Sequence, residues 1–370
     1  MIGFADLYAK IFGPWIEGRR WTGANIPTDA IRVFYGRDHV PGRNEVVQGG
    51  IVKCQDLATV FPNTPVDPNI VYLVSSALPA TATALLKAAK RAGARVVLNQ
   101  NGVAYPAWHG PGWESTNKPM KELIRAADHV VYQSLFCKMS ADRYLGPCSS
   151  SHEILHNPVD TAVFVPGGAL PLAQGPVILA SGSHVQFYRV ESVVRAFALV
   201  SGKFPLARLV LAGHLGWRPD EREACGEVLR LCRDLHVEDK VEIRGRYTQE
   251  QAIPLLQSAH ILMHTKYNDP CPRMVVEAMS CGLPVVFSAS GGTPELVGDS
   301  AGVGVAVPQG WKKLHIPAPE ELSGAVETII GRYDTMSRAA RARAVEKLDL
   351  KSWLDRHGRI FREQLTAGAG

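Results

Sequence analysis

The chain repeats one pattern twice, in which short apolar runs alternate with longer segments of helical period. In residues 30–157 the apolar runs are AIRVFYG, NIVYLVSS, ARVVLNQNG, HVVYQS and EILHN, and the alternation starts again at VILASG in residues 177–182. This order predicts parallel sheets with helices on both faces, because parallel strands need crossover connections. Near-continuous apolar runs fit strands that are buried on both faces. The predicted fold class is α/β, with two doubly wound, Rossmann-like domains in tandem.

The segment between the two repeats has a different composition. Residues 157–176, NPVDTAVFVPGGALPLAQGP, are rich in Pro and Gly and lack a helical period, which predicts an interdomain linker. We therefore expect domains at 1–160 and 175–345, and a C-terminal helix at 346–370 that returns to the first domain. Doubly wound sheets bind ligands at the carboxyl ends of their strands, so the cleft between the domains is the expected site.

Composition excludes several classes of protein. The net charge of +5 and pI near 8.8 are too mild to indicate a nucleic-acid binder, and they suit an anionic small ligand or an anionic membrane surface equally well. The seven cysteines include no CxxC pair, so neither a metal site nor a disulfide framework is predicted. A reducing, cytoplasmic compartment follows. No apolar run reaches the ~18 residues of a spanning helix, and no secretory signal is visible.

The N-terminal segment admits two interpretations. Residues 2–20, IGFADLYAKIFGPWIEGRR, carry apolar side chains at near-helical spacing and end on Arg19 and Arg20. One interpretation is a helix packed on its own domain. The other is an interfacial helix that makes a peripheral contact with the inner face of a membrane. The first is favoured, because interfacial helices usually carry more Lys and Arg on their polar face.

The most informative stretch is YNDPCPRMVVEAMSCGLPVVFSASGGTPELVGD, residues 267–299. Asp269 follows the predicted strand HILMHT, and Glu277 lies eight positions later inside the next predicted helix. The start of that helix suits an anionic group such as a phosphate. A carboxylate on a mostly apolar helix must be hydrogen-bonded. Ribose hydroxyls and a pairing with Arg273 are both acceptable partners for Glu277.

The order of these motifs resembles the retaining GT-B glycosyltransferases of the family 4 type. The resemblance covers about Gly49–Val307 and includes EAMSCGLPVV, GGTPE, ILHNPVDTAVFVP, RLVLAGH and VEIRGRY. It implies a GT-B fold, a nucleotide-sugar donor, and transfer with retention at the anomeric carbon. The first domain would bind the acceptor and the second the donor.

The resemblance also implies roles for individual residues. Glu277 would hold the nucleotide ribose, and Asp269, in place of the family's Glu, would face the donor sugar. Asn101 stands where the family often has a His; it can hydrogen-bond a hydroxyl but cannot shuttle a proton. These three are the expected catalytic residues. The expected donor-binding residues are Gly49, Gly50, Gly182, Ser183, His184, Arg189, Arg246, Tyr247, Cys271, Pro272, Arg273 and Met274.

One departure from the family concerns charge. The family has an Arg and a Lys after the first strand of its second domain, and both bind the departing diphosphate. Here Ser183 and Tyr188 occupy those positions. Such cations usually contribute much to catalysis. Arg189, Arg273 and His184 are the candidates to replace them.

The loop AYPAWHGPGW also admits two interpretations. Trp108, His109 and Trp113 would form a sugar-stacking wall for the acceptor, with His109 as a substitute for the family's His, or they would belong to a packed surface loop. Both remain open on the sequence.

The predicted function is a retaining glycosyltransferase that needs no metal or other cofactor and acts on a glycan or lipid-linked acceptor in surface polysaccharide or glycoconjugate biosynthesis. The alternative is a catalytically weak relative that binds sugars or supports a partner enzyme. A nucleotide-sugar epimerase fits less well. A dehydrogenase is disfavoured, because no GxGxxG motif follows a predicted strand.

Overall fold

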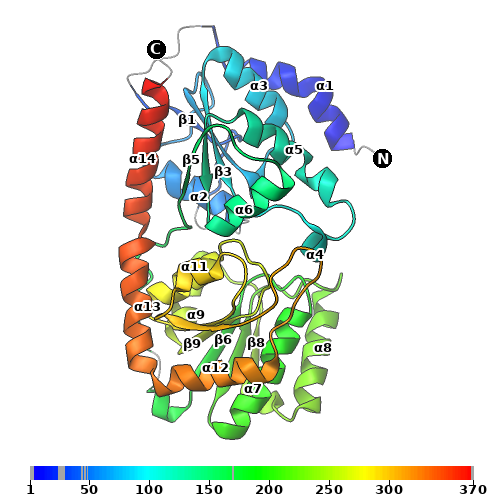
Figure 1. The fold of residues 1–370 in the computed structure, drawn as a ribbon, viewed down its shortest axis with the longest axis vertical. Coiled ribbons are helices and arrows are strands. Elements are labelled where there is room, and N and C mark those ends of the chain that lie inside the picture. Colours follow the sequence, from blue (N-terminus) through cyan, green and yellow to red (C-terminus); the bar gives the residue numbers. More distant parts are fainter. Residues whose placement is uncertain are drawn as a thin grey trace. The chain divides into compact units, whose positions relative to one another are not determined.

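The structure is a computed structural model that describes residues 4–23, 30–42, 45, 47, 49–168 and 171–367, and of residues 4–10 the backbone alone. Its contacts divide the chain into two units. The first unit holds Met1–His156 with Leu350–Gly370, and the second holds Asn157–Asp349. Each unit is built on one parallel sheet with helices packed on it, which confirms the α/β prediction (Figure 1).

The sheet of the first unit runs in chain order, β1-β2-β3-β4-β5, and every pairing is parallel. Its inner strands are buried on both faces, as the near-continuous apolar runs predict. In register, Leu73 lies opposite Leu98, which in turn lies opposite Val130. The strands are β1 (Val33–Phe34), β2 (Ile70–Val74), β3 (Arg95–Gln100), β4 (His129–Tyr132) and β5 (Ser151–Ile154).

Local signals fix the ends of several helices in this unit. Gly93 takes a φ of 80° and ends α3, and the Ser134 hydroxyl accepts the Cys137 N–H to cap α6. The helices are α1 (Phe4–Gly18), α2 (Gly49–Ala58), η1 (Ser75–Ala77), α3 (Ala82–Ala92), α4 (Pro106–His109), α5 (Trp113–Ala126), α6 (Leu135–Tyr144) and α14 (Leu350–Thr366).

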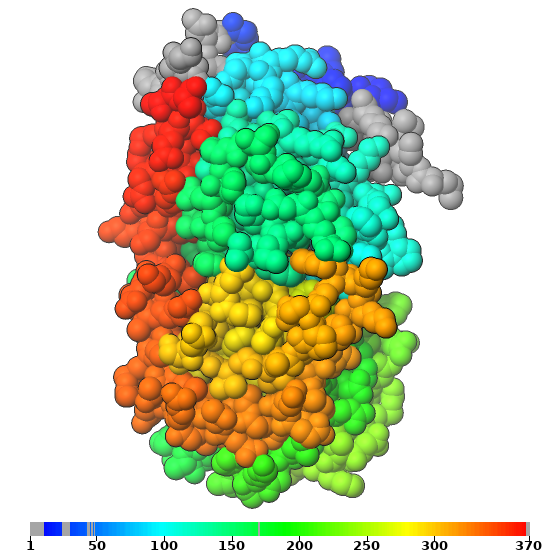
Figure 2. Space-filling view, in the orientation of Figure 1, coloured from blue at the N-terminus to red at the C-terminus, as the bar shows by residue number. Residues whose placement is uncertain are grey.

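The last helix, α14, completes the core of the first unit. It buries Trp353, Ile360 and Phe361 at helical spacing against strands β1 and β2. A buried hydrogen-bond chain supports this packing: Asn99 Nδ2 donates to the Tyr72 hydroxyl over 2.9 Å, and that hydroxyl lies 3.0 Å from His357 Nε2. Figure 2 shows the red surface of α14 beside the cyan-to-green surface of the same unit.

The sheet of the second unit has the order β11-β10-β9-β6-β7-β8, again parallel throughout. Its strands are β6 (Val177–Ser181), β7 (Arg208–Ala212), β8 (Val241–Arg244), β9 (Ile261–His264), β10 (Val285–Ser288) and β11 (Gly302–Val305). Its helices are η2 (Leu172–Gln174), α7 (Tyr188–Lys203), α8 (Glu221–Asp234), η3 (Glu238–Lys240), α9 (Gln249–Gln257), α10 (Arg273–Ser280), α11 (Thr293–Val297), α12 (Pro319–Gly331) and α13 (Tyr333–Lys347).

The segment expected to link the two domains instead begins the second unit. Asn157 Nδ2 donates to the Cys271 carbonyl over 2.6 Å, and the Phe164 carbonyl accepts the Ser280 hydroxyl over 2.6 Å. Val159 and Phe164 are fully buried in this unit's core. The linker prediction is therefore wrong for these residues, because two apolar side chains within a Pro- and Gly-rich run anchor it by burial.

The state of His357 generates a pH prediction. Burial lowers the pKa of His357 to about 4, below the ordinary 6.5 of the unfolded chain. The unfolded state therefore binds more protons between these values, so stability should fall as pH drops from 6.5 to 4, by up to roughly 3 kcal/mol. Urea unfolding followed by intrinsic tryptophan fluorescence measures this loss. His357→Gln should make the free energy of unfolding depend less on pH between 6.5 and 4. Equal slopes of unfolding free energy against pH for the variant and wild type would contradict the attribution of this dependence to His357.

Candidate functional site

Three loops meet at one edge of the second sheet. Strands β6, β9 and β10 are neighbours and parallel, so the loops after them share the carboxyl edge. The loops are bonded to one another: the Thr265 hydroxyl donates to the Arg189 carbonyl over 3.0 Å, and the Asn268 N–H donates to the Ser290 hydroxyl over 2.8 Å. The Gly292 N–H donates to the Asp269 carbonyl over 2.8 Å. This edge is the candidate donor site.

Asp269 is a buried carboxylate that contacts a histidine and a lysine. Its Oδ2 lies 3.0 Å from His264 Nε2 and 3.2 Å from Lys266 Nζ. Burial raises the pKa of Asp269, but the charges of Lys266 and Arg189 and the hydrogen bond from His264 together bring it well below its usual range. Asp269 is therefore ionised at neutral pH. Burial lowers the pKa of His264, which favours a neutral ring that donates from Nε2.

Glu277 lies in the middle of α10 and is also buried. The Arg273 Nε donates to its Oε1 over 2.8 Å, because side chains four positions apart share a helix face. The pairing considered from the sequence is thus present. The ribose contact remains a prediction. Burial and the nearby charge of Glu277 raise the pKa of Tyr247 to about 12, so these two expected donor residues lie near each other.

Arg189 and His184 both turn into the protein. The Arg189 guanidinium donates from Nη1 to the Ser183 carbonyl, and only 6% of this residue is exposed. His184 lies 3.2 Å through Nε2 from the Ala212 carbonyl, and burial with the Arg189 charge lowers its pKa to about 3. This shift favours a neutral ring, which does not support the expectation that His184 replaces a missing cation. Gly182 makes the turn with a φ of 123°.

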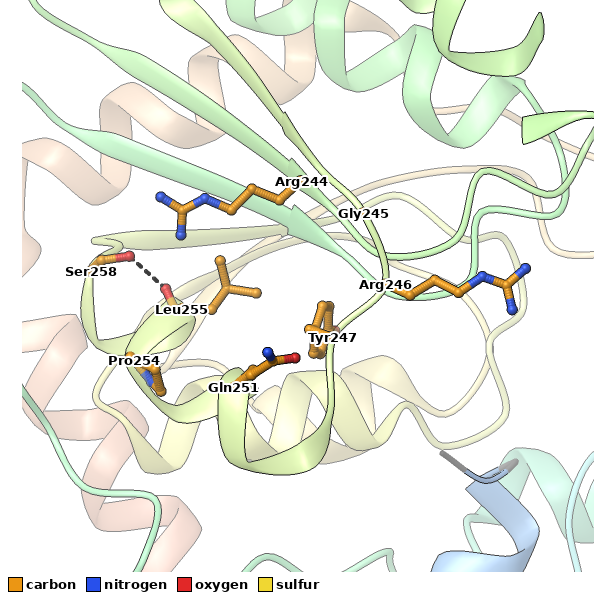
Figure 3. A pocket seen from close by; sticks show the side chains of 8 residues that line it. All are labelled: Arg244, Gly245, Arg246, Tyr247, Gln251, Pro254, Leu255 and Ser258. Atoms are coloured by element: carbon orange, nitrogen blue, oxygen red, sulfur yellow. Dashed lines mark hydrogen bonds between the residues drawn. The ribbon is translucent and has the colours of Figure 1, made fainter. Parts of the chain in front are cut away.

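Arg246 and Tyr247 line a pocket of about 310 Å³ after β8 (Figure 3). The Tyr247 hydroxyl lies 2.6 Å from the Ser181 hydroxyl at the end of β6. The Arg246 guanidinium points away from the rest of the lining in Figure 3 and lies 2.9 Å from His214 Nδ1. The lining residues are Arg244, Gly245, Arg246, Tyr247, Gln251, Pro254, Leu255 and Ser258.

The start of α10 carries the remaining donor residues. Cys271 is buried, and its backbone carbonyl accepts a hydrogen bond from Asn157. Pro272 caps the helix in an extended conformation, and Arg273 and Met274 form its first turn. Backbone N–H groups in a first turn lack intrahelical acceptors, so this end of the helix favours an anion.

The expected residues of the first unit fall into two places. Asn101 follows β3; its N–H donates to the Ser75 hydroxyl, and its Oδ1 accepts the Gly102 N–H over 2.8 Å. Gly49 and Gly50 open α2, as the sequence indicates. A Cβ on Gly50 would come 2.8 Å from the Ala77 Cβ, so this glycine lets α2 pack against η1, whereas Gly49 has open space.

Trp108, His109 and Trp113 belong to one aromatic cluster. Trp108 is 49% exposed, and its Nε1 donates to the Val103 carbonyl over 2.8 Å, which fixes the indole ring. His109 Nε2 lies 2.8 Å from the Thr116 hydroxyl. Tyr105 and Tyr144, which the sequence did not single out, complete the cluster: they stack at 6.0 Å, and the Trp113 ring meets Tyr144 edge-on at 5.1 Å.

Sequence reasoning also missed two residues that contact Asp269. These are His264, at the end of β9, and Lys266, two residues later. Their positions in the sequence could have indicated both residues, because both stand at the carboxyl end of a predicted strand and close to Asp269, which was already assigned to the site. Their contacts with Asp269 depend on the bend of the loop, which the sequence pattern does not reveal.

Two kinds of element are absent from the part of the chain that the structure describes. Within it, no group of three or more His, Cys, Asp or Glu side chains is arranged to hold a metal ion. The helices within the same residues also lack the length and apolar content that crossing a membrane requires.

Comparison with solved structures defines the class of fold. The chain resembles Anabaena HepE, solved in complex with UDP, with a TM-score of 0.65 at 18% identity over 80% of this chain and 79% of that one. It equally resembles sucrose-phosphate synthase from Thermosynechococcus elongatus, with a TM-score of 0.65 at 17% identity over 84% of this chain and 76% of that one. The fold is therefore GT-B, with two Rossmann-like domains.

A family model matches the second part of the chain. Residues 170–330 match the model described as glycosyl transferases group 1. The resemblance found in the motifs is thereby confirmed, and both Asp269 and Glu277 lie within the matched residues.

Curated relatives match over part of their length. N-acetyl-alpha-D-glucosaminyl L-malate synthase of Bacillus anthracis is 30% identical over 167 residues, 40% of this chain and 41% of that protein. D-inositol 3-phosphate glycosyltransferase of Mycolicibacterium smegmatis is 28% identical over 193 residues, 48% of this chain and 42% of that protein. In both comparisons the chain spans less than half the length of the relative.

The close approach at Gly291 generates a prediction. Its φ is 68°, and an added Cβ would lie 2.4 Å from the Asp269 carbonyl oxygen. Gly291→Ala should lower the free energy of unfolding by roughly 1–3 kcal/mol, because the loop that carries Asp269 must move. Gly324→Ala is the control: it lies inside α12 with open space around it, and alanine should be neutral or stabilising there. Similar effects of both substitutions on urea unfolding would contradict the prediction.

Proposed function

We propose that this protein is a glycosyltransferase that moves a sugar from a nucleotide-sugar donor to a glycan or lipid-linked acceptor, with retention at the anomeric carbon. The observation that carries the proposal is the pair Asp269 and Glu277: two buried carboxylates, eight residues apart, at the carboxyl edge of the sheet and inside the residues that match the family. We place the reaction in surface polysaccharide or glycoconjugate biosynthesis.

Each group in the donor site has a role in this proposal. Glu277 accepts hydrogen bonds from the ribose hydroxyls, and Arg273 orients its carboxylate by donating to Oε1. Asp269 faces the hydroxyls of the donor sugar. The first turn of α10 binds the donor phosphate or sugar through backbone N–H groups.

The chemistry balances without a basic side chain. The bond between the anomeric carbon and the phosphate oxygen breaks, and its electron pair leaves with the nucleoside diphosphate. The acceptor hydroxyl forms the new bond on the same face of the sugar, and its proton passes to the leaving phosphate. Asn101 orients a hydroxyl and transfers no proton. No metal takes part in this proposal, and activity in the presence of EDTA tests that point.

The acceptor is proposed to bind at the aromatic cluster of the first unit. The exposed, fixed indole of Trp108 presents an apolar face of the kind on which sugar rings pack, and Trp113 extends the same cluster. His109 is proposed to contact an acceptor hydroxyl.

A second candidate function is a catalytically weak relative that binds sugars or supports a partner enzyme. It is supported by Ser183 and Tyr188 at the two expected cation positions and by the inward turn of Arg189. The two candidates differ in one respect that is simple to measure, which is the binding of a nucleoside diphosphate.

Calorimetric titration with UDP, GDP and ADP tests the proposal. UDP is the first choice, because the similar Anabaena protein HepE was solved with it. Glu277→Ala should weaken binding more than tenfold, since a charge-assisted hydrogen bond contributes about 1.5–3 kcal/mol. Glu250→Ala, an exposed glutamate on α9, is the control. If wild-type protein binds none of the three nucleotides, the result favours the second candidate function, a catalytically weak relative. If folded Glu277→Ala protein binds a nucleotide as wild type does, Glu277 is not part of the binding site.

We further propose that α1 contacts an anionic membrane surface on the cytoplasmic side. Its described side chains include three exposed apolar residues, Ile11, Phe12 and Trp15, and the Arg19 guanidinium lies 4.6 Å from the centre of the Trp15 ring. The opposite face is fixed to α3, where the Thr81 hydroxyl donates to Glu17 Oε1 over 2.6 Å. An aromatic and apolar face beside a cation is typical of interfacial helices.

Vesicle sedimentation tests this contact. Wild-type protein should bind phosphatidylglycerol vesicles more strongly than phosphatidylcholine vesicles. The double substitution Phe12→Ser and Trp15→Ser should reduce binding by roughly tenfold, because it removes two large apolar side chains from the surface. Leu206→Ser alters an equally exposed apolar residue of the second unit and should leave binding unchanged. Equal binding by all three proteins would refute the contact.

A further inference from the structure

The proposed donor carries a diphosphate, and its negative charge must be met by cations in the site. The three loops at the carboxyl edges of β6, β9 and β10, together with the first turns of α7 and α10, are described in full. Within them the Arg and Lys side chains are Arg189, Lys266 and Arg273. The question is which of these three can reach a ligand.

Two of the three are committed inside the protein. Arg189 is 6% exposed and donates to the Ser183 carbonyl. Burial lowers the pKa of its guanidinium, and the charge of Asp269 opposes that effect. Arg273 donates to Glu277, and 17% of its side chain is exposed. By contrast, 37% of the Lys266 side chain is exposed, the largest fraction of the three.

Lys266 also stands at a fixed place. The residues on either side of it are bonded to the start of α7: the Thr265 hydroxyl donates to the Arg189 carbonyl, and the Tyr267 N–H donates to the Tyr188 hydroxyl, both over 3.0 Å. Tyr188 is the residue that stands where a lysine was expected. The backbone that carries Lys266 is therefore fastened beside the position that lacks its cation.

The charge balance around Lys266 leaves it able to bind an anion. An ammonium group has three donors, and its ion pair with Asp269 spans 3.2 Å. The same carboxylate oxygen also accepts from His264 over 3.0 Å, so Asp269 does not depend on Lys266 alone. Shared between carboxylate and phosphate, Lys266 would also screen the repulsion between these two anions.

The other exposed cation of this unit that we assigned to the donor lies elsewhere. Arg246 follows β8, the edge strand, and the sheet order places β6 and β7 between β8 and β9. Its Nε lies 3.6 Å from Glu221, and its Nη2 lies 2.9 Å from His214. It lines the pocket after β8, at the same carboxyl edge of the sheet but with two strands between it and the loop that carries Asp269.

We propose that Lys266 is the cation that binds the diphosphate of the donor, in place of the two basic residues missing at Ser183 and Tyr188. This inference rests on the proposed function, because it assumes a nucleoside diphosphate ligand. It differs from the expectation that an arginine, Arg189 or Arg273, takes this role. In this proposal the cation is supplied by the loop bonded to the start of α7.

Calorimetry with a series of uracil ligands tests the proposal. The ligands are uridine, UMP and UDP; the guanine or adenine series replaces them if GDP or ADP is the nucleotide that wild-type protein binds. Lys266→Met should weaken diphosphate binding by roughly tenfold or more, since it removes a charge-assisted contact, and should leave nucleoside binding within about twofold. Lys266→Arg should restore most of the affinity. Added NaCl should weaken diphosphate binding less in Lys266→Met than in wild type.

Lys203→Met is the matched control. Lys203 is also a lysine in an ion pair, 2.7 Å from Glu327, but it lies at the opposite end of α7 from Tyr188. The Lys203→Met variant should bind the diphosphate as wild type does. Thermal unfolding checks that every variant is folded.

The outcomes separate the two proposals. Unchanged diphosphate binding by Lys266→Met overturns the role of Lys266 and leaves the proposed function standing. Equal losses of affinity for the nucleoside and for the diphosphate in Lys266→Met also overturn the role of Lys266, because they indicate general damage to the site. Wild-type protein that binds no nucleoside diphosphate overturns the proposed function and this inference together.

Discussion

The candidate site depends on one constraint, the burial of an ionised carboxylate. Asp269 is 7% exposed and remains charged because His264, Lys266 and Arg189 surround it. An uncompensated buried charge would be costly, so the loops that supply these groups must stay together. Arg189 turns inward and donates to the Ser183 carbonyl, and the backbone at Gly291 closely approaches the backbone of Asp269. The shape of this edge of the second sheet is thus set by electrostatics as much as by apolar packing.

The first unit depends on a different interaction, the return of the chain at its end. Helix α14 closes the core over β1 and β2, and the hydrogen-bond chain from Asn99 through Tyr72 to His357 gives that packing a single register. Each polar group in this chain has a partner, so its burial fixes the helix without a large desolvation cost. The unit is therefore assembled from two segments of the chain that the whole second unit, Asn157–Asp349, separates in the sequence.

The two positions that lack the expected basic residues lie close to a lysine on a neighbouring loop. A phosphate responds to the field at its own location, whichever element supplies the cation. Ser183, in the loop after β6, and Tyr188, at the start of α7, are uncharged, whereas Lys266 places one positive charge on the loop bonded to the start of α7. A comparison of motif positions alone indicates a site that lacks positive charge. The contacts of the loop that carries Lys266 instead place a lysine beside the two positions.

The sequence alone predicted the α/β class, the two parallel sheets and the stretch that carries Asp269 and Glu277, because strand and helix periodicity and short motifs are local properties. It also suggested the pairing of Arg273 with Glu277, which needs only the four-residue spacing of a helix face. The burial of residues 157–164, the neutral state of His184, and the meeting of Lys266 with Asp269 were decided by tertiary structure. Each depends on which distant side chains surround a residue, and no local pattern contains that information.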